Sequence, residues 1–247
     1  MTRHVTRMTL AEASFYTPEQ KAEIAAQYPE HERDARLDGV PQLGSGRIFP
    51  LAEGAVAVAA FDLPAHWPVL GAIDFGWEHP TAAVKLAHDR DGDVVYVTHG
   101  YRVRRATPVI HAAALKAWGA GLPFAWPHDG YQHDKQSGKP TAEAYREQGL
   151  AMLPEHARFP DLSTGVEAGL MAMLDRMQTG RLKVFGHLRE WLDEFRLYHR
   201  KEGVVVKLHD DLMCATRYGI MCLRFAAPRG GRWKRAIAYP ANYMSIA

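Results

Sequence analysis

Short apolar segments, the first of which ends in an acidic residue, constrain the fold of this sequence more than any other feature. Residues 69–74 (VLGAID) form the first, and residues 81–87 and 94–98 follow as two further runs rich in β-forming residues. Asp91-Gly92, between the second and third runs, is typical of a hairpin turn. We therefore expect three strands in a meander.

Helical and strand patterns alternate after this meander. We expect four helices: one opened by Thr107-Pro108 and extending to 118, two at 165–178 and 188–198, and a last one from Asp210 or Asp211 to about 224. We expect strands at 123–126 and 182–185, and a polar hairpin that turns at Lys201-Glu-Gly203. A meander followed by alternating helices and strands predicts an α/β fold with a mixed central sheet flanked by helices.

The first forty residues predict isolated elements and no domain of their own. Thr17-Pro-Glu-Gln20 has the signature of a capped helix that begins at its proline. A second short helix is expected over 29–37 and a strand over 5–10, without a partner nearby in the sequence. We expect residues 1–43 to be a linker or the remnant of a neighbouring domain, and Gly44-Ser-Gly46 to mark the change to a folded domain.

Composition places the 247 residues among ordinary folded proteins. They are 47% hydrophobic and 23% charged, which disfavours wholesale disorder. The longest apolar run, 55–61, is far shorter than the about 20 residues that a membrane helix needs. The N-terminus lacks the apolar core of a signal peptide. We expect a cytosolic protein that contacts no membrane.

Basic residues are concentrated at the end of the sequence. Six Arg and Lys residues and no acidic residue follow Asp211, whereas the first 211 residues contain more acids than bases. This asymmetry favours contact with a polyanion or an acidic partner, and a solubilising tail accounts for it equally well. We expect the folded domain to extend over 44–225 and the basic tail, 226–247, to be flexible.

Three aspartates lie at the predicted ends of strands or at the start of a helix, where α/β folds commonly place functional residues. Asp74 ends the first strand, Asp129 follows the strand at 123–126, and Asp211, with Asp210 beside it, begins the last helix. Each has an ordinary explanation, because aspartates before glycine favour turns and aspartates at helix starts act as caps. Together they indicate a cluster at one end of the sheet, where open α/β folds bind ligands.

Clustered carboxylates repel one another and need a cation. Hard oxygen ligands select Mg²⁺ or Mn²⁺ over zinc, and two such ions about 4 Å apart can activate a water and stabilise a departing alkoxide in phosphodiester hydrolysis. His128 and His209 each adjoin a proposed ligand and are candidates to support it. A structural zinc site would prefer closely spaced cysteines, whereas Cys214 and Cys222 are eight residues apart in a helical stretch. That spacing also argues against a disulfide between them.

Four segments resemble the C-terminal nuclease domain of the large terminase subunit of tailed bacteriophages. They are LGSGRIFP at 43–50, GAIDFGWEHPTAAV at 71–84, AWPHDG at 125–130 and HDDLMCATRY at 209–218. Their order and spacing extend the resemblance over about residues 40–225. The resemblance implies an RNase H/RuvC-like fold and a metal-dependent endonuclease that cuts concatemeric double-stranded DNA with two Mg²⁺ or Mn²⁺ ions per site.

Carried onto this sequence, the resemblance implies that Asp74, Asp129 and Asp211 are the catalytic metal ligands. RuvC-like relatives carry Asp-x-x-Asp-Ala at the last helix, and Cys214 stands here in place of the second acid, which makes Asp210 a possible supporting ligand. The polar hairpin is implied to lie near the active site and to guide DNA. The candidate DNA-binding residues are Arg102, Arg104, Arg105, Arg200, Lys201 and Lys207.

The packaging ATPase that accompanies this domain in the family has no counterpart in the sequence. Its phosphate-binding Gly-x-x-x-x-Gly-Lys-Ser/Thr loop is missing, and SGKPT at 137–141 shares only a Gly-Lys pair with it. We expect an isolated nuclease fragment without ATPase activity. In the full terminase it would work with the ATPase domain, the small terminase subunit and the portal, in the cytoplasm of the infected bacterial host.

Two other functions stay open at this point. The basic tail is compatible with a non-catalytic module that clamps DNA or docks on the portal. A RuvC-like junction resolvase would share the fold and prefer branched DNA. A module that only clamps DNA or docks on the portal would not cleave DNA, whereas a nuclease would. A junction resolvase would cleave branched DNA selectively.

Overall fold

A central sheet holds the predicted site residues in place. The computed structural model of the chain describes residues 9–28, 33, 37, 46–133 and 138–228. In this part, eight strands form one mixed sheet in the order β1-β7-β4-β3-β2-β5-β6, with β10 paired to β2. The strands are β1 (Ala57–Val58), β2 (Pro68–Asp74), β3 (Thr81–Asp89), β4 (Val94–Val103), β5 (Pro123–Ala125), β6 (Ala151–Met152), β7 (Leu182–Phe185) and β10 (Ala227–Pro228).

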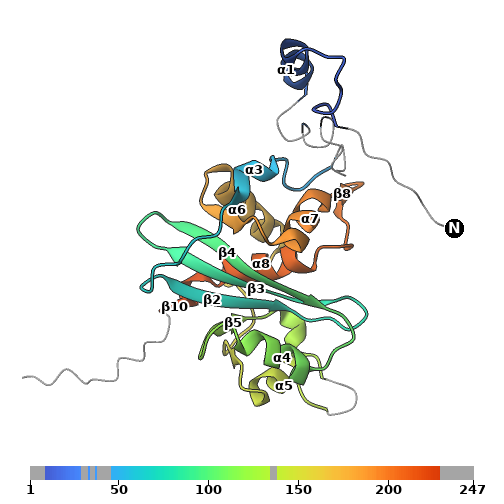
Figure 1. Ribbon diagram of the computed structural model, residues 1–247. Helices are drawn as coiled ribbons and strands as arrows, with labels where there is room; N and C mark the ends of the chain where they lie inside the picture. Colours follow the sequence, from blue (N-terminus) through green and yellow to red (C-terminus); the bar gives the residue numbers. More distant parts are fainter. Residues whose placement is uncertain (1–8, 29–32, 34–36, 38–45, 134–137, 229–247) are drawn as a thin grey trace, which may run out of the picture.

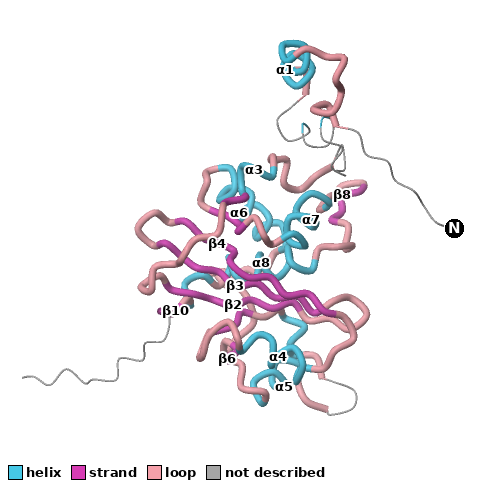
Figure 2. The backbone as a smooth tube through the Cα atoms, in the orientation of Figure 1, coloured by secondary structure: helices cyan, strands magenta, loops and turns pink. Residues whose placement is uncertain are grey.

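Helices cover both faces of this sheet (Figures 1 and 2). One face carries α3, α6, α7 and α8, and the other carries α4 and α5. Their bounds are α3 (Glu53–Val56), α4 (Pro108–Lys116), α5 (Thr141–Glu147), α6 (Val166–Gln178), α7 (Arg189–Leu197) and α8 (Asp211–Met221), with 3₁₀ turns η1 (His128–Tyr131) and η2 (Leu223–Phe225). Because both faces are covered, β2 and β3 are buried along most of their length. None of the helices in the described ranges combines the length and the apolar character needed to cross a lipid bilayer.

β2, β3 and β4 form the predicted antiparallel meander. Asp74 pairs with Ala82, and Thr81 pairs with Val103. β5 joins the other edge of β2 in parallel register. The carboxyl ends of β2, β4 and β5 therefore reach the same end of the sheet, on the right in Figure 1.

The last helix, α8, packs directly on β2 and β3. Gly219 permits this close approach, because a Cβ at that position would lie 2.5 Å from Leu86 Cδ1 and 3.3 Å from Ala72 Cβ. α7 is tied to α8 by Trp191, whose Nε1 donates a hydrogen bond to Thr216 Oγ1 at 2.8 Å. These contacts fix where α8 begins relative to the sheet.

The predicted polar hairpin is confirmed. β8 (Arg200–Lys201) and β9 (Val204–Val205) pair in antiparallel fashion. Glu202 and Gly203 at its turn adopt positive φ angles of 52° and 80°. The Arg200 N–H donates a hydrogen bond to the Gly46 carbonyl at 2.7 Å, which ties the hairpin to the segment that precedes α3. The hairpin and the start of α8 are joined by only five residues, from Val206 to Asp210.

The N-terminal helix α1 (Pro18–Ala26) begins at the predicted proline. Thr17 Oγ1 accepts a hydrogen bond from the Gln20 N–H, and Gln20 Oε1 accepts one from the Thr17 N–H, which completes the predicted capping box. Residues 9 and 10, the end of the predicted strand, form no strand. The rest of that prediction, and most of the predicted helix at 29–37, lies outside the described residues, and the role of residues 1–43 as a linker stays a prediction.

Several short elements are not predicted by the sequence. They are β1, α3, α5, β6 and β10. Elements of two to seven residues carry too little periodicity to be recognised, and a two-residue strand is defined by its partner. Ala227, at the start of the expected tail, pairs with Val69 and so belongs to the sheet. The remainder of the tail, 229–247, lies outside the described residues.

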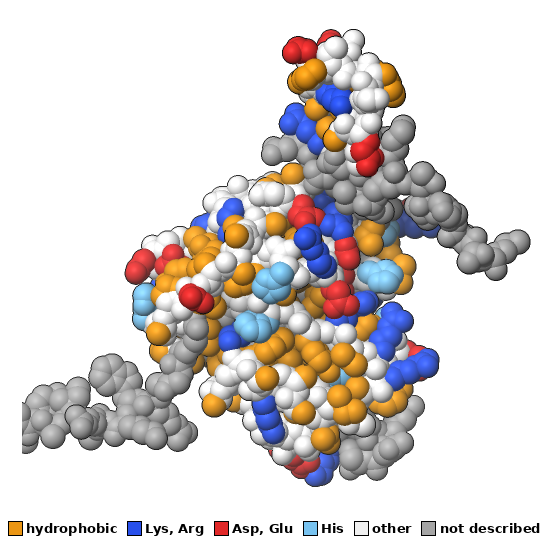
Figure 3. Space-filling model, viewed as in Figure 1, with side chains coloured by type: hydrophobic (Ala, Val, Ile, Leu, Met, Phe, Trp, Pro, Cys, Tyr) orange, Lys and Arg blue, Asp and Glu red, His pale blue; other side chains and the backbone are white. Residues whose placement is uncertain are grey.

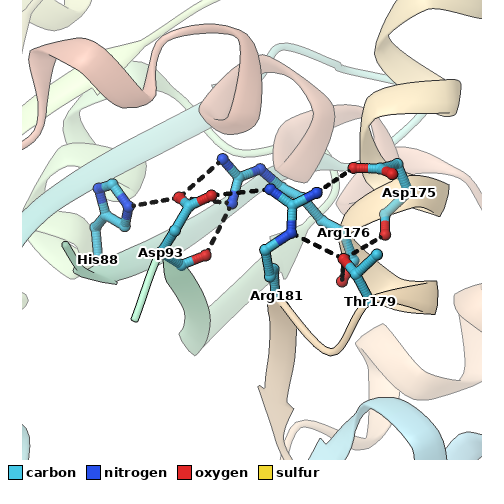
Figure 4. A network of polar contacts seen from close by, with 6 residues as sticks. All are labelled: His88, Asp93, Asp175, Arg176, Thr179 and Arg181. Atoms are coloured by element: carbon cyan, nitrogen blue, oxygen red, sulfur yellow. Dashed lines mark hydrogen bonds and ion pairs between the residues drawn. The ribbon is translucent and has the colours of Figure 1, made fainter. Parts of the chain in front are cut away.

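A network of polar contacts holds the β3–β4 turn against α6 and β7 (Figure 4). Asp93 adopts a positive φ of 48° after this turn. Its Oδ1 accepts hydrogen bonds from Arg176 at 3.1 Å, its Oδ2 accepts one from Arg181 at 2.9 Å, and His88 Nε2 lies 3.2 Å from Oδ1. Partial burial acts to raise the pKa of Asp93, but the hydrogen bonds from Arg181 and His88 and the charge of Arg176 lower it to about 2.

Asp93→Asn is expected to lower the free energy of unfolding by about 1 kcal/mol at pH 7, a modest value because the side chain is 46% exposed and its ion pairs are screened. The folded pKa lies below the unfolded one, so this stabilisation is complete above about pH 4 and is lost as the pH falls towards 2. Urea unfolding of both proteins between pH 7 and pH 3 measures the difference. Asp91→Asn, which changes an exposed acid of the same turn, is the matched control. Equal stability of Asp93→Asn and wild type at pH 7 would contradict the assignment.

Candidate functional site

Four aspartates from three separate parts of the sequence gather at the carboxyl end of β2. Asp74 is the last residue of β2, and Asp129 lies in η1, immediately after the strand that pairs with β2 in parallel. Asp210 and Asp211 begin α8, which covers the same strand. Parallel pairing brings the carboxyl ends of two strands to one edge, which is why residues far apart in the sequence meet.

The charges of these aspartates act on one another. Burial is the largest cause that raises the pKa of Asp74 well above its usual range, and the charges of Asp129, Asp211 and Asp210 raise it further. Burial also raises the pKa of Asp129, and burial together with the charge of Asp211 raises that of Asp210. The site therefore concentrates negative charge that the surrounding protein compensates only in part.

Asp129 carries an oxygen without a donor. Its Oδ1 is buried and accepts no hydrogen bond within the described part of the chain. A buried carboxylate oxygen without a partner is costly and unusual in a folded protein. Such an oxygen fits a position where a cation binds.

Neither aspartate at the start of α8 acts as its cap. Asp210 is the N-cap residue, but its side chain makes no capping hydrogen bond. Instead, the free thiol of Cys214 donates to Asp210 Oδ2 at 3.6 Å. Asp211 is directed to Arg102 at the end of β4, whose Nε and Nη2 both donate to Asp211 Oδ2, at 3.1 and 3.0 Å. The ordinary explanation of these acids as helix caps does not apply.

Glu194 of α7 caps α8 in their place, and the sequence analysis missed it. Glu194 Oε2 accepts hydrogen bonds from the backbone N–H groups of Leu212 at 2.7 Å and Met213 at 3.2 Å. Burial, and then the charge of Asp211, raise the pKa of Glu194 to about 8 against the opposing effect of the Leu212 amide. A signal for this residue exists in the sequence, because Glu194 lies on the same helical face as Trp191, which is buried.

Arg217 of α8 is a second residue that the sequence analysis did not single out. It is 5% exposed, and its Cζ lies 4.5 Å from the centroid of the Tyr218 ring. Gly169 of α6 makes room for it, because a Cβ there would lie 2.6 Å from Arg217 Cδ. Its charge lowers the pKa of Asp74 and so opposes part of the repulsion in the cluster.

The predicted histidines lie around the cluster. His128 is exposed, its charge lowers the pKa of Asp129, and its ring is 4.9 Å from that of His156. His209 is exposed, adopts a positive φ of 55°, and places Nδ1 3.5 Å from Arg102 Nη2. Their supporting role stays a prediction.

The predicted DNA-binding residues occupy different environments. Arg102 is directed into the acidic cluster, whereas Arg104 and Arg105 lie exposed in the loop that follows β4. Arg105 forms an ion pair with Glu78, and Arg200 forms one with Glu167. Lys201 and Lys207, on and after the hairpin, are exposed. On the face seen in Figure 3, Lys and Arg side chains lie among Asp and Glu side chains towards the right, the side to which the end of β2 points in Figure 1.

The oxygen donors fit a hard divalent cation such as Mg²⁺ or Mn²⁺. In the arrangement described here, however, no group of three or more His, Cys, Asp or Glu side chains among the described residues stands ready to hold a metal ion. One of the expected ligand oxygens, Asp211 Oδ2, accepts hydrogen bonds from the Arg102 guanidinium in this arrangement.

Comparisons with known proteins found a family model and relatives that match most of this chain. The chain matches the family model of the terminase RNaseH-like domain over residues 71–223. The large terminase subunit of Salmonella phage P22 is 47% identical over 223 residues, which cover 90% of this chain and 45% of the relative. The chain spans about half the length of the curated relatives it matches.

Solved structures agree with this match. The nuclease domain of the P22 large terminase superposes with a TM-score of 0.70 at 45% identity, covering 75% of this chain and 96% of that one. The large terminase nuclease domain of bacteriophage SPP1, solved with bound Mn, has a TM-score of 0.50 at 17% identity, covering 66% and 92%; this likeness concerns the fold.

Glu194→Gln is expected to change how stability depends on pH. The folded pKa of about 8 lies above the unfolded value, so the wild type loses stability as the pH rises from about 4.5 to 8, by at most about 1.4 kcal/mol per pH unit. The variant lacks this loss, so its stability relative to wild type should rise over that range.

Urea unfolding of both proteins between pH 5 and pH 8.5 measures this change. Glu190→Gln, an exposed glutamate one turn earlier on α7, is the matched control. Parallel stability profiles for wild type and Glu194→Gln would contradict the raised pKa.

Proposed function

Because the chain belongs to the family of terminase RNase H-like domains, we propose that it is the nuclease domain of a phage DNA-packaging terminase. Its reaction is metal-dependent hydrolysis of phosphodiester bonds in double-stranded DNA. The observation that carries this proposal is the cluster of aspartates at the end of β2, in which burial and the neighbouring charges raise the pKa of Asp74 and Asp129 Oδ1 has no donor.

Asp74, Asp129 and Asp211 are the residues we assign to two Mg²⁺ or Mn²⁺ ions, with Asp210 as a possible further ligand. When bound, such ions supply the positive charge that activates a water molecule and stabilises the departing 3′-oxygen. Asp74 is held by the backbone of β2, and Asp129 by the 3₁₀ turn η1 that follows β5. His128 and His209 adjoin the ligands and would orient them.

Exposed basic residues around the cluster would bind the DNA backbone. Arg104, Arg105, Lys201 and Lys207 are exposed, and Arg200 stands at the base of the hairpin. Contacts with phosphates do not depend on base sequence, so we expect binding that is nonspecific and sensitive to salt. Arg102 would contact phosphate only after leaving Asp211.

The curated relatives are about twice as long as this chain. We assign the cutting of concatemeric DNA during packaging, and work with an ATPase domain, the small subunit and the portal in the host cytoplasm, to a full terminase in which a domain like this one supplies the hydrolysis. The chain has no phosphate-binding Gly-Lys-Ser/Thr loop, so we expect no ATPase activity from these residues. The family match favours this function over a junction resolvase, whereas a DNA-clamping or portal-docking role is compatible with it.

Asp74→Asn is expected to reduce cleavage of plasmid DNA in Mn²⁺ or Mg²⁺ by at least about 100-fold, because the amide is a weaker ligand and leaves the site with less negative charge. Cleavage is measured on gels, and Mn²⁺ binding is measured in parallel by calorimetry. Asp62→Asn, at an exposed acid outside the cluster, is the matched control. The assignment fails when Asp74→Asn, correctly folded, cuts DNA and binds Mn²⁺ like the wild type.

Lys201→Gln and Lys207→Gln are each expected to weaken DNA binding and to reduce the dependence of log K on log salt concentration by about 0.9 per lost phosphate contact. Fluorescence anisotropy with duplexes of unrelated sequence, at several salt concentrations, measures this slope. Lys116→Gln, an exposed lysine at the end of α4, is the control. An unchanged slope in both hairpin variants would remove the hairpin from the DNA interface.

A further inference from the structure

Arg102 occupies a carboxylate that the proposed function needs. Its Nε and Nη2 both donate to the same oxygen, Asp211 Oδ2, at 3.1 and 3.0 Å. Asp211 is only 6% exposed, so little water screens this pair. Both donors take Oδ2, but a guanidinium this close to the carboxylate repels a divalent cation and so weakens its binding. Moving Arg102 off Asp211 would therefore favour binding of a cation there.

A second acceptor already stands beside the Arg102 guanidinium. Glu194 Oε1 already forms an ion pair with Arg102 Nε at 3.0 Å, but it accepts no hydrogen bond within the described part of the chain, because the single hydrogen on Nε is donated to Asp211. A buried carboxylate oxygen in this state lacks a stabilising interaction that a small rotation of Arg102 would provide. The two carboxylates thus compete for one guanidinium.

Glu194 is held in place, and Arg102 has the freedom to move. The other oxygen of Glu194 is held by the backbone N–H groups of Leu212 and Met213. The helix that carries Glu194 is fixed to α8 by the hydrogen bond between Trp191 and Thr216. Arg102 lies near the end of β4, and its long side chain is 18% exposed. A transfer of the guanidinium therefore requires only a change of its side-chain torsions.

We propose that Glu194 is a positioning residue that takes over the hydrogen bonds of the Arg102 guanidinium when Asp211 binds a divalent cation. This inference rests on the proposed function, because it takes Asp211 as a metal ligand. Glu194 performs two tasks: one oxygen keeps the start of α8, and with it Asp211, in place, and the other accepts Arg102. The positive charge of Arg102 then stays inside the domain, paired with Glu194 in place of Asp211.

A double-mutant cycle on Arg102 and Glu194, read out as Mn²⁺ affinity by calorimetry, tests this assignment. Arg102→Gln removes the competitor for Asp211, so we expect Mn²⁺ binding to tighten several-fold. Glu194→Gln replaces one of the two acceptor oxygens with an NH2 group that cannot accept from Arg102, so we expect binding to weaken about tenfold or more. In the double variant, the Glu194 substitution should change the affinity by less than about twofold relative to Arg102→Gln alone. Glu190→Gln, on the same helix, should match the wild type.

The cycle separates the proposed role from two simpler ones. A glutamate that only caps α8, or that binds the cation directly, would weaken Mn²⁺ binding equally with and without Arg102. Such additive effects would overturn the proposal, as would weaker binding in Arg102→Gln. Thermal unfolding of each variant identifies any that is misfolded, and the Arg102→Gln variant, altered at a partly exposed side chain, still decides whether Arg102 competes with the cation.

A titration with Mg²⁺, followed by NMR of the arginine Nε–Hε groups, provides an independent measurement. The Arg102 resonance should shift on saturation in the wild type and shift much less in Glu194→Gln. A resonance that does not move at saturation would overturn the transfer.

If the wild type binds Mn²⁺ and Asp74→Asn does not, the metal site is supported, whatever the double-mutant cycle finds. Additive effects in the cycle would then overturn only the role of Glu194. Absence of Mn²⁺ binding by the wild type would overturn the metal site and the role of Glu194 together.

Discussion

Repulsion between carboxylates at the end of β2 is the electrostatic cost that the packing of this domain has to balance. Four aspartates reach this point from three parts of the sequence, and burial makes their charges more costly than they would be in water. The protein supplies part of the compensation itself. Arg102 binds Asp211, and the buried Arg217 lowers the pKa of Asp74. Asp129 Oδ1 has no donor among the residues that the structure describes, and that is the place we assign to a bound cation.

The scaffold bears this repulsion because its elements are positioned by contacts that do not involve the site. The sheet is covered on both faces, and α8 approaches it closely at Gly219. Glu194 caps α8 from a neighbouring helix, which leaves both aspartates at the start of α8 available for other partners. A helix that used these aspartates as its own caps would bind their oxygens to backbone amides and would remove them from the site. The external cap is therefore the local feature that makes a charged helix start available for chemistry.

Family membership and site geometry support the same function by independent routes. The match to the terminase RNaseH-like domain extends over most of the sheet and includes all four aspartates. The geometry adds what a match does not provide: which carboxylates are already paired, which buried oxygen has no donor among the described residues, and which arginine lies between two of the acids. The curated relatives that the chain matches are about twice as long as this chain.

The sequence by itself determined the long elements and the acids at their ends. Continuous apolar runs predict β2 and β3, Thr17 and Gln20 predict the start of α1, and Asp91-Gly92 predicts a hairpin, because each signal is local and needs no partner. Only the tertiary structure decided the short strands, such as β10, and the partners of the charged groups. The pairing of Arg102 with Asp211 was not predicted, and Glu194 is one of several charged residues of α7, so the sequence does not show which of them is buried against α8. The reason is physical: hydrogen bonds and charges act between atoms close in space, and the chain brings those atoms together only when distant segments pack.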